Sequence, residues 1–379
     1  MSDITVSRRS ALGAIAGLGA SAALAGSTTA QGKSAGLTSM QRIEAWELGE
    51  RKGIASLRRA SRPQPLPGPG QVLITVRASA LNNRDLAIVS GGYGVRPRPA
   101  TMIPLGDGVG VVTALGADVT GFNIGDRVSC PHFVNWLDGR YDPRVLEQDL
   151  GSSTDGWLAD RVVRPAASLV RVPDELSDVE AAAMPAAAVT AWFTLQQFAQ
   201  VQAGETVLTL GTGGVSVMAL QIARMAGARV VITSSSDAKL ERMRALGAQI
   251  TVNYRTHADW EKRVLEATDG RGVGVVVDTV GGSSLDRSLA CTAPNARIGL
   301  IGALDGAIST TLRPVTLRNL LLRGITSGSR RTLEDVLRAF AANNIKPLVD
   351  RVFPFAEAPA AYEFLKSGGH VGKIVISHA

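Results

Sequence analysis

The hydrophobic and polar positions of residues 205–247 predict a strand, a turn, a helix, a second strand and a second helix, in that order. Residues 206–210 form a short apolar, β-branched run, and an apolar helical pattern ends at Gly227. Between them lies a glycine turn made of Gly211, Thr212, Gly213, Gly214, Val215 and Ser216. A turn of this kind leaves free N–H groups at a helix N-terminus, where the pyrophosphate of a dinucleotide binds.

The glycines of this turn have separate predicted roles. Gly211 permits the tight turn, and Gly213 lets the backbone approach the phosphates. The third position of the fingerprint is Ser216 rather than glycine or alanine, which weakens the match but keeps a small residue there. The alternative is an ordinary strand–turn–helix without a ligand.

The end of the second strand, residues 229–233, indicates which dinucleotide is bound. An NAD site has an acidic residue about 20 residues after the glycines, where it binds the ribose. This chain instead places three hydroxyls and a lysine there: Ser234, Ser235, Ser236 and Lys239. They could hold a 2′-phosphate, and Asp237 is interpreted as the N-cap of the next helix, so NADP is favoured over NAD. The alternative is a polar turn with a cap.

Further apolar runs predict four more strands, at residues 249–252, 274–278, 297–301 and 320–326. Six strands with helical crossovers predict an α/β fold with a doubly wound parallel sheet. Ligands bind such sheets beyond the carboxyl ends of the strands, which adds Val280, Gly302 and Leu304 to the predicted cofactor site.

Composition narrows the class of protein. The 379 residues are 45% hydrophobic and 19% charged, which is enough for two compact parts with large cores. The net charge of +7 comes from scattered basic residues, so nucleic acid is not an expected partner. Cys130 and Cys291 lie far apart, and the four histidines show no ligand spacing, which argues against a disulfide framework or a cysteine zinc site.

Residues 1–30 have the features of an export signal. Arg8 and Arg9 precede an apolar run, residues 11–25, and small residues follow up to Ala30. The paired arginines favour the twin-arginine route to the periplasm, and the run is too short for a membrane span. The alternatives are an inert tail, or translation that starts at Met40 and leaves the protein in the cytoplasm.

Before the glycine turn, short β-rich runs at residues 71–76 and 109–113 alternate with Gly- and Pro-rich turns. This part resembles the GroES-like catalytic domain of the medium-chain dehydrogenase/reductase superfamily. The matching motifs are Pro67-Gly68-Pro69-Gly70-Gln71-Val72-Leu73, Gly106-Asp107-Gly108-Val109-Gly110, Phe122-Asn123-Ile124-Gly125-Asp126-Arg127-Val128 and Gly372-Lys373-Ile374-Val375-Ile376. The resemblance implies a GroES-like domain at 31–186, a Rossmann NADP-binding domain at 187–326 and a return to the catalytic domain at 327–379.

Within that superfamily the chain is similar to the zinc-free, quinone-oxidoreductase-like branch, whose members are often labelled zinc-type alcohol dehydrogenase-like. The zinc enzymes have a Cys at Asn82, a His at Asp107, a Glu at Gly108 and a Cys near Ala186. Asp107 alone could bind a metal, so no metal site is expected. Without zinc, reduction of a quinone or conjugated enone by NADPH is favoured, because the product anion is delocalised and needs little more than hydrogen-bond donors.

The same resemblance implies the site residues. Asn82, Asp85 and Tyr93 match the pattern Asn-x-x-Asp followed by Gly-x-Tyr: Asn82 would donate to the substrate oxygen, Tyr93 would line the pocket, and Asp85 would act there or organise the loop. Thr190 and Tyr254 match residues near the carboxamide and the 2′-phosphate. A homodimer through residues 320–326 is expected by analogy. The alternatives are a zinc-free alcohol or aldehyde oxidoreductase, or an NADPH-binding protein without turnover.

Overall fold

A computed structural model describes residues 41–378 of the chain except 95–98, 283 and 303–310. The predicted export signal and Leu304 therefore lie outside the described residues. Residues Met40–Ala379 form one compact unit. Within the described part of the chain, no helix is both long and apolar enough to cross a membrane.

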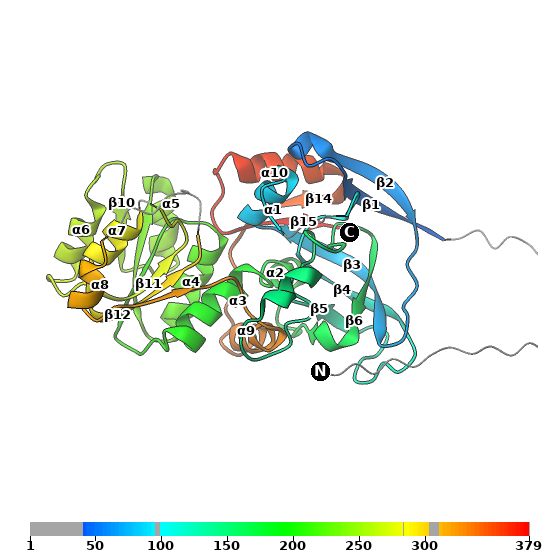
Figure 1. Ribbon diagram of the computed structural model, residues 1–379, viewed down its shortest axis with the longest axis horizontal. Coiled ribbons are helices and arrows are strands. Elements are labelled where there is room, and N and C mark those ends of the chain that lie inside the picture. Colours follow the sequence, from blue (N-terminus) through cyan, green and yellow to red (C-terminus); the bar gives the residue numbers. More distant parts are fainter. Residues whose placement is uncertain (1–40, 95–98, 283, 303–310, 379) are drawn as a thin grey trace, which may run out of the picture. The chain divides into compact units, whose positions relative to one another are not determined.

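The glycine turn belongs to a six-stranded parallel sheet (Figure 1). Its strands, in spatial order, are β10 (Ile250–Asn253), β9 (Arg229–Ser234), β8 (Thr206–Thr209), β11 (Val273–Asp278), β12 (Thr292–Leu300) and β13 (Leu321–Gly324). The order reverses between β8 and β11, which is the switch point where doubly wound sheets bind their ligands. The predicted α/β fold and parallel sheet are confirmed.

The consecutive strands of this sheet are connected by helices, namely α4 (Gly214–Met225), α5 (Asp237–Ala245), α6 (Trp260–Ala267), α7 (Ser284–Ala290) and α8 (Arg313–Leu317). The strands of this sheet are apolar runs because both faces of the sheet are buried. Val275, Val276 and Val277 of β11, for example, are fully buried. Helix α4 is also largely buried, and after its cap at Ala226 the chain turns at Gly227, whose φ of 77° suits glycine.

The second sheet has seven strands and is mostly antiparallel. It contains β14 (Val349–Pro354), β15 (Lys373–Ser377), β3 (Gln71–Leu81), β4 (Asp107–Leu115), β5 (Arg127–Ser129), β7 (Val170–Arg171) and β6 (Arg161–Pro165), the last paired with β3. Strand β15 lies between β14 and β3, so residues beyond the six-stranded sheet return to the β-rich part (Figure 1). The predicted run at 71–76 continues to Leu81 because Ala78 and Ala80 are also buried in this sheet.

The remaining elements complete the β-rich part and its surroundings. They are the hairpin β1 (Arg42–Leu48) and β2 (Leu57–Pro63), the helices α1 (Asn83–Val89), α2 (Asp178–Ala182), α3 (Ala187–Trp192), α9 (Arg330–Ala342) and α10 (Ala358–Lys366), the 3₁₀ turns Ile54–Ser56, Pro143–Gln148, Ala166–Ser168 and Phe355–Glu357, and a π turn at Phe193–Phe198. A backbone hydrogen bond of 2.9 Å from Gly372 N to Thr212 O joins the chain before β15 to the glycine turn.

Candidate active site

The glycine turn between β8 and α4 has the shape of an open cradle. Gly211 has a φ of 74°, and its N–H donates to Thr233 Oγ1 at 3.2 Å. A Cβ added to Gly211 or Gly213 would meet no atom within 4 Å. Gly213 is the N-cap of α4, and no side chain bonds to this helix terminus. The turn therefore fits the pyrophosphate of a dinucleotide, which needs open space beside a helix N-terminus.

The next residues of the turn face protein rather than open space. A Cβ on Gly214 would lie 2.8 Å from Lys373 Cδ, so glycine is needed there for packing. Ser216 is buried and its hydroxyl donates to Leu210 O at 2.6 Å, which fastens α4 to the end of β8. The serine at the third fingerprint position thus keeps the helix close to the strand. Thr212 is buried, and Val215 is half-buried on the first turn of α4.

The predicted 2′-phosphate residues meet at the ends of β9 and β10. Ser234 is buried at the end of β9, Ser235 is half-buried, and Tyr254 N donates to Ser234 O at 3.0 Å while its ring stays 42% exposed. Ser236, not Asp237, is the N-cap of α5, because the Ser236 hydroxyl accepts from Lys239 N. That expectation for Asp237 was wrong: a serine directly before it takes the capping role.

Two of these polar side chains already have protein partners. Asp237 Oδ1 accepts from Asn253 Nδ2 at 2.9 Å. The Lys239 ammonium donates to Gly368 O at 2.5 Å and His370 O at 3.1 Å, both in the loop before β15. Partial burial lowers the pKa of Lys239. Lys239 thus ties the serine-rich turn to that loop, and its role toward a 2′-phosphate stays a prediction.

The predicted positions beyond β11 and β12 lie beside each other. Val280 N donates to Asp278 Oδ1 at 3.1 Å, and Gly302 N donates to Asp278 O at 3.1 Å. A Cβ on Gly302 would lie 2.0 Å from Thr279 O, so this close approach requires glycine. Thr190 of α3 is buried and its hydroxyl donates to Ala186 O at 2.7 Å, which leaves the lone pairs of its oxygen able to accept hydrogen bonds.

Asn82 lies in a cluster of side chains from three distant segments. Its Nδ2 donates to Asp107 Oδ2 at 2.9 Å, and its Oδ1 accepts from Lys373 Nζ at 2.6 Å. Lys373 Nζ also donates to Asp107 Oδ2 at 3.2 Å and to Leu81 O at 2.7 Å. Asp107 and Lys373 are buried at 0% and 2% exposure, whereas Asn82 is half-buried. Asn82 is therefore the member of this cluster that a ligand can reach.

Sequence reasoning missed the role of Lys373. The residue belongs to the tail motif Gly372-Lys373-Ile374-Val375-Ile376, to which the sequence pattern assigns no function. The available signal was a lysine at the start of an otherwise apolar strand, where burial demands a partner of opposite charge.

Asp85 organises the start of α1. Its Oδ2 accepts from Asn82 N at 2.7 Å, while Oδ1 is buried without a hydrogen-bond partner among the described residues. Burial raises the pKa of Asp85 to about 6, although the neighbouring Arg84 lowers it. Because its bound oxygen caps the helix beneath Asn82, Asp85 positions the backbone that carries the site.

Tyr93 lies beside Arg84, which sequence reasoning did not single out. Arg84 Nη1 lies 3.4 Å from Tyr93 Oη, and the guanidinium carbon is 5.3 Å from the centre of the Tyr93 ring. The same Nη1 lies 2.7 Å from Asp149 Oδ1 and 2.9 Å from His132 Nδ1. Gly106 makes room for this guanidinium, since a Cβ there would be 2.6 Å from Arg84 Nη2.

The pKa directions in this group follow from burial and charge. Burial raises the pKa of Tyr93 and lowers that of His132, which the Arg84 charge lowers further. For Asp149 burial acts upward, but Arg84 and His132 hold its pKa below the usual range. At neutral pH the group is thus an ionised Arg84–Asp149 pair with a neutral imidazole, and it fixes the position of the Tyr93 phenol.

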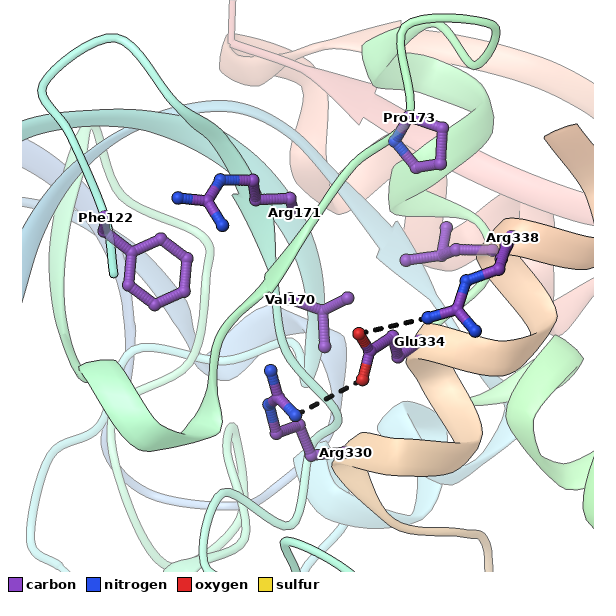
Figure 2. A pocket seen from close by; sticks show the side chains of 8 residues that line it. Phe122, Val170, Arg171, Pro173, Arg330, Glu334 and Arg338 are labelled. Carbon is purple, nitrogen blue, oxygen red and sulfur yellow. Dashed lines mark hydrogen bonds and ion pairs between the residues drawn. The ribbon is translucent and has the colours of Figure 1, made fainter. Parts of the chain in front are cut away.

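A groove elsewhere on the described surface, between β7 and α9, is another candidate for a binding site. It encloses about 210 Å³. Figure 2 shows Glu334 between Arg330 and Arg338, both of which it binds, and a third arginine, Arg171, beside Phe122. Arg171, the third, pairs with Asp126. The charges are largely neutralised within the protein, and no polar group of the glycine turn or of the Asn82 cluster lines the groove. The candidate site therefore remains at the switch point.

Metal-ligating residues do not gather at this site. Among the described residues, no group of three or more His, Cys, Asp or Glu could hold a metal ion. At the positions of the zinc ligands, Asp107 has an ion pair with Lys373, and Asn82 and Ala186 are poor ligands.

Comparison with known proteins finds relatives over both sheets of the structure. Residues 68–174 match a family described as the alcohol dehydrogenase GroES-like domain, and residues 214–342 match one described as zinc-binding dehydrogenase. A zinc-type alcohol dehydrogenase-like protein of Schizosaccharomyces pombe is 41% identical over 83% of this chain and 92% of its own length. An acryloyl-coenzyme A reductase of Metallosphaera sedula is 33% identical over 83% of this chain and 94% of its own.

A solved structure of a mycobacterial protein complexed with NADPH is also similar. It superposes with a TM-score of 0.73 at 28% identity and covers 88% of this chain and 99% of its own. Extended similarity over both sheets, together with the cradle at the switch point, identifies the cofactor class as NAD(P). The chain therefore belongs to the medium-chain dehydrogenase/reductase superfamily, related to the zinc-type alcohol dehydrogenases, and it is an oxidoreductase.

Proposed function

We propose that this protein reduces a conjugated carbonyl, an enone or a quinone, with NADPH and without a metal ion. The observation that carries the proposal is the Asn82 amide, held by Lys373 on its oxygen and by Asp107 on its nitrogen. This leaves one Nδ2 N–H of a half-buried residue for a ligand. A donor fixed in this way suits the oxygen on which charge develops when a conjugated carbonyl accepts hydride.

The donor set supports metal independence. A catalytic zinc site needs three protein ligands, and the two ligand positions with polar side chains, Asn82 and Asp107, already bind an ammonium. A divalent cation at that position would lie against the Lys373 charge. Simple alcohols need zinc or a strong base to lose their proton, whereas a conjugated carbonyl does not, so the site favours reduction of the latter.

The residues divide the task between them. The nicotinamide of the cofactor supplies the hydride, and Gly211, Gly213 and the first turn of α4 would hold its pyrophosphate. Asn82 would donate to the carbonyl oxygen of the acceptor. Tyr93 would form a wall of the acceptor pocket, where Arg84 holds its phenol within 3.4 Å and adds a positive charge.

For the choice of cofactor, the serines and Tyr254 support NADP. Ser234 and Tyr254 are joined by a backbone hydrogen bond, so the hydroxyl groups and an exposed ring share one edge of the site. No acidic residue directly follows β9. The NADPH bound in the mycobacterial relative is consistent with this choice.

For the acceptor, the acryloyl-coenzyme A reductase supports an enone, because acryloyl is a conjugated carbonyl. The S. pombe relative favours a second candidate function, oxidation or reduction of a simple alcohol or aldehyde. A third candidate, NADPH binding without turnover, would explain the cradle but not the oriented Asn82 amide.

A homodimer through β13 is also proposed. This strand is the edge of the six-stranded sheet, and Leu321 on it is 55% exposed. An exposed apolar edge strand is a pairing surface, and its test is the mass of the particle in solution.

The experiment that tests the function measures NADPH oxidation in the presence of a chelator, with quinones, enones and aldehydes as acceptors and NADH as the control donor. Reduction of an enone or quinone, faster with NADPH, would support the proposal. Aldehyde reduction lost on chelation would show a metal enzyme. Tight NADPH binding with no acceptor reduced would favour the protein without turnover.

A further inference from the structure

We infer that Lys373 is a positioning residue of the active site, whose ammonium takes the place of the metal ion and orients the Asn82 amide. This inference rests on the proposed function, in which Asn82 donates to the acceptor oxygen. It assigns a role in the reaction to a buried charge that lies 291 positions away from Asn82 in the sequence.

The first observation is that the ammonium lies between ligand positions. In zinc relatives the metal ligands fall at Asn82 and Asp107, and here Lys373 Nζ contacts both, at 2.6 and 3.2 Å. The third partner is the backbone oxygen Leu81 O, at 2.7 Å. An ammonium has three donors, so the three acceptors saturate it, and Lys373 cannot reach a substrate itself. Its effect must pass through Asn82.

The second observation is that two opposite charges define one amide orientation. The cation of Lys373 binds Asn82 Oδ1, and the carboxylate of Asp107 binds Nδ2. Rotation of the amide by 180° would place its NH₂ group against the ammonium and its oxygen against the carboxylate, so the other orientation is excluded. An amide whose oxygen is bound to a cation is also a better N–H donor, because chains of hydrogen bonds polarise one another.

The third observation connects the lysine to the cofactor turn. The Lys373 stem passes Gly214, where a Cβ would lie 2.8 Å from Lys373 Cδ. Next to it, Gly372 N donates to Thr212 O at 2.9 Å. The stem therefore packs against the first turn of α4 while its ammonium binds Asn82. One side chain sets the distance between the cofactor cradle and the donor to the acceptor.

The test separates the charge of Lys373 from its stem. The double variant K373M/D107N removes both buried charges together and keeps an unbranched side chain against Gly214. We expect a folded protein whose affinity for NADPH is within threefold of the wild type. Its kcat for the enone or quinone should fall at least about thirtyfold, with a smaller change in the acceptor KM, because the amide loses its fixed orientation.

The variant D107N is the second measurement and covers the case in which the double variant does not fold. It keeps the lysine and removes the anion that binds Asn82 Nδ2, so kcat should fall about tenfold with NADPH affinity unchanged. The control is K366M, which removes an exposed lysine of α10 and should leave both parameters unchanged.

Two outcomes would overturn the inference. Wild-type kcat in K373M/D107N would show that the charges serve no reaction, and parallel loss of NADPH binding and kcat in D107N would show that the cluster supports the fold alone. Failure of the proposed function gives a different result: the wild type itself would bind NADPH and reduce no conjugated carbonyl.

Discussion

The cofactor cradle and the Asn82 cluster differ in what they are made of. The cradle consists of backbone and of space left free by Gly211 and Gly213. The Asn82 cluster consists of side chains that occupy one another's hydrogen-bonding groups. A methyl group added to the cradle meets no atom of the protein, whereas removal of one charge from the cluster leaves its partner buried and unpaired. The proposed pyrophosphate site is thus separable from the fold, while the proposed acceptor site is continuous with the core.

The largest expected effect is on stability, from the single variant K373M. It leaves Asp107 as an unpaired buried charge, so the free energy of unfolding should fall by about 3–5 kcal/mol. Urea denaturation of the wild type, K373M and the exposed-site control K366M would measure it. If K373M matched K366M, the cluster would not be continuous with the core, and the contrast with the cradle would disappear.

The variant N82A is expected to affect turnover more than cofactor binding. Loss of the donor to the acceptor oxygen should lower kcat by about a hundredfold to a thousandfold, while the Kd for NADPH changes less than threefold, since the cradle lies on a different sheet. Steady-state kinetics and NADPH fluorescence would separate the two quantities. Equal losses in both would mean that the cradle depends on the cluster.

A smaller effect concerns Asp85, which lies under the cluster. Its pKa is raised from 3.8 to about 6, so between those pH values the native state binds more protons than the unfolded state. The free energy of unfolding that this extra proton binding contributes is therefore largest below pH 4 and is lost as pH rises through 6. At pH 7 the ionised carboxylate lowers stability by about 3 kcal/mol, at roughly 1.4 kcal/mol per pKa unit.

The variant D85N removes this titration and keeps an oxygen for Asn82 N. Its stability relative to the wild type should increase between pH 4 and 6 and stay constant above that range, as measured by urea denaturation at several pH values. The matched control is D174N, which changes an exposed aspartate and should show no such increase. A flat difference for D85N would mean that the buried carboxylate is not destabilised.

The smallest expected effect on stability comes from the cradle. In G213A the new methyl group meets no atom within 4 Å and φ is −77°, so the free energy of unfolding should change by less than about 0.5 kcal/mol. NADPH affinity should fall about tenfold, because the methyl occupies space meant for phosphate. The matched variant G214A should show the reverse, a loss of stability from contact with Lys373.

The same contrast explains what the sequence could and could not predict. Strands β10 (Ile250–Asn253) and β11 (Val273–Asp278) lie within one residue of the predicted ranges 249–252 and 274–278, because local periodicity encodes them. The glycine turn was found for the same reason. In contrast, Asn82 meets Asp107 and Lys373 across 25 and 291 positions, and Arg84 meets Asp149 across 65. No local pattern records which distant residues share a buried charge.

Resemblance supplied part of what local pattern could not. It placed Asn82 and Tyr93 together, and both lie on or beside α1, the former as its N-cap. It did not indicate Arg84, although this residue lies between them in the sequence. A charged residue beside two predicted site residues was the signal, and its burial became visible with Gly106, Asp149 and His132 packed around it.

The position of β15 also determines when this protein can become active during its synthesis. Residues 206–324, which make the six-stranded sheet, can leave the ribosome and pair before residues 373–377 have been translated. The seven-stranded sheet cannot, since β15 lies between β14 and β3, and β3 was made almost three hundred residues earlier. Such distant pairing is slow. A nascent chain can therefore form the glycine turn first, and the proposed acceptor site is completed last, when Lys373 reaches Asn82.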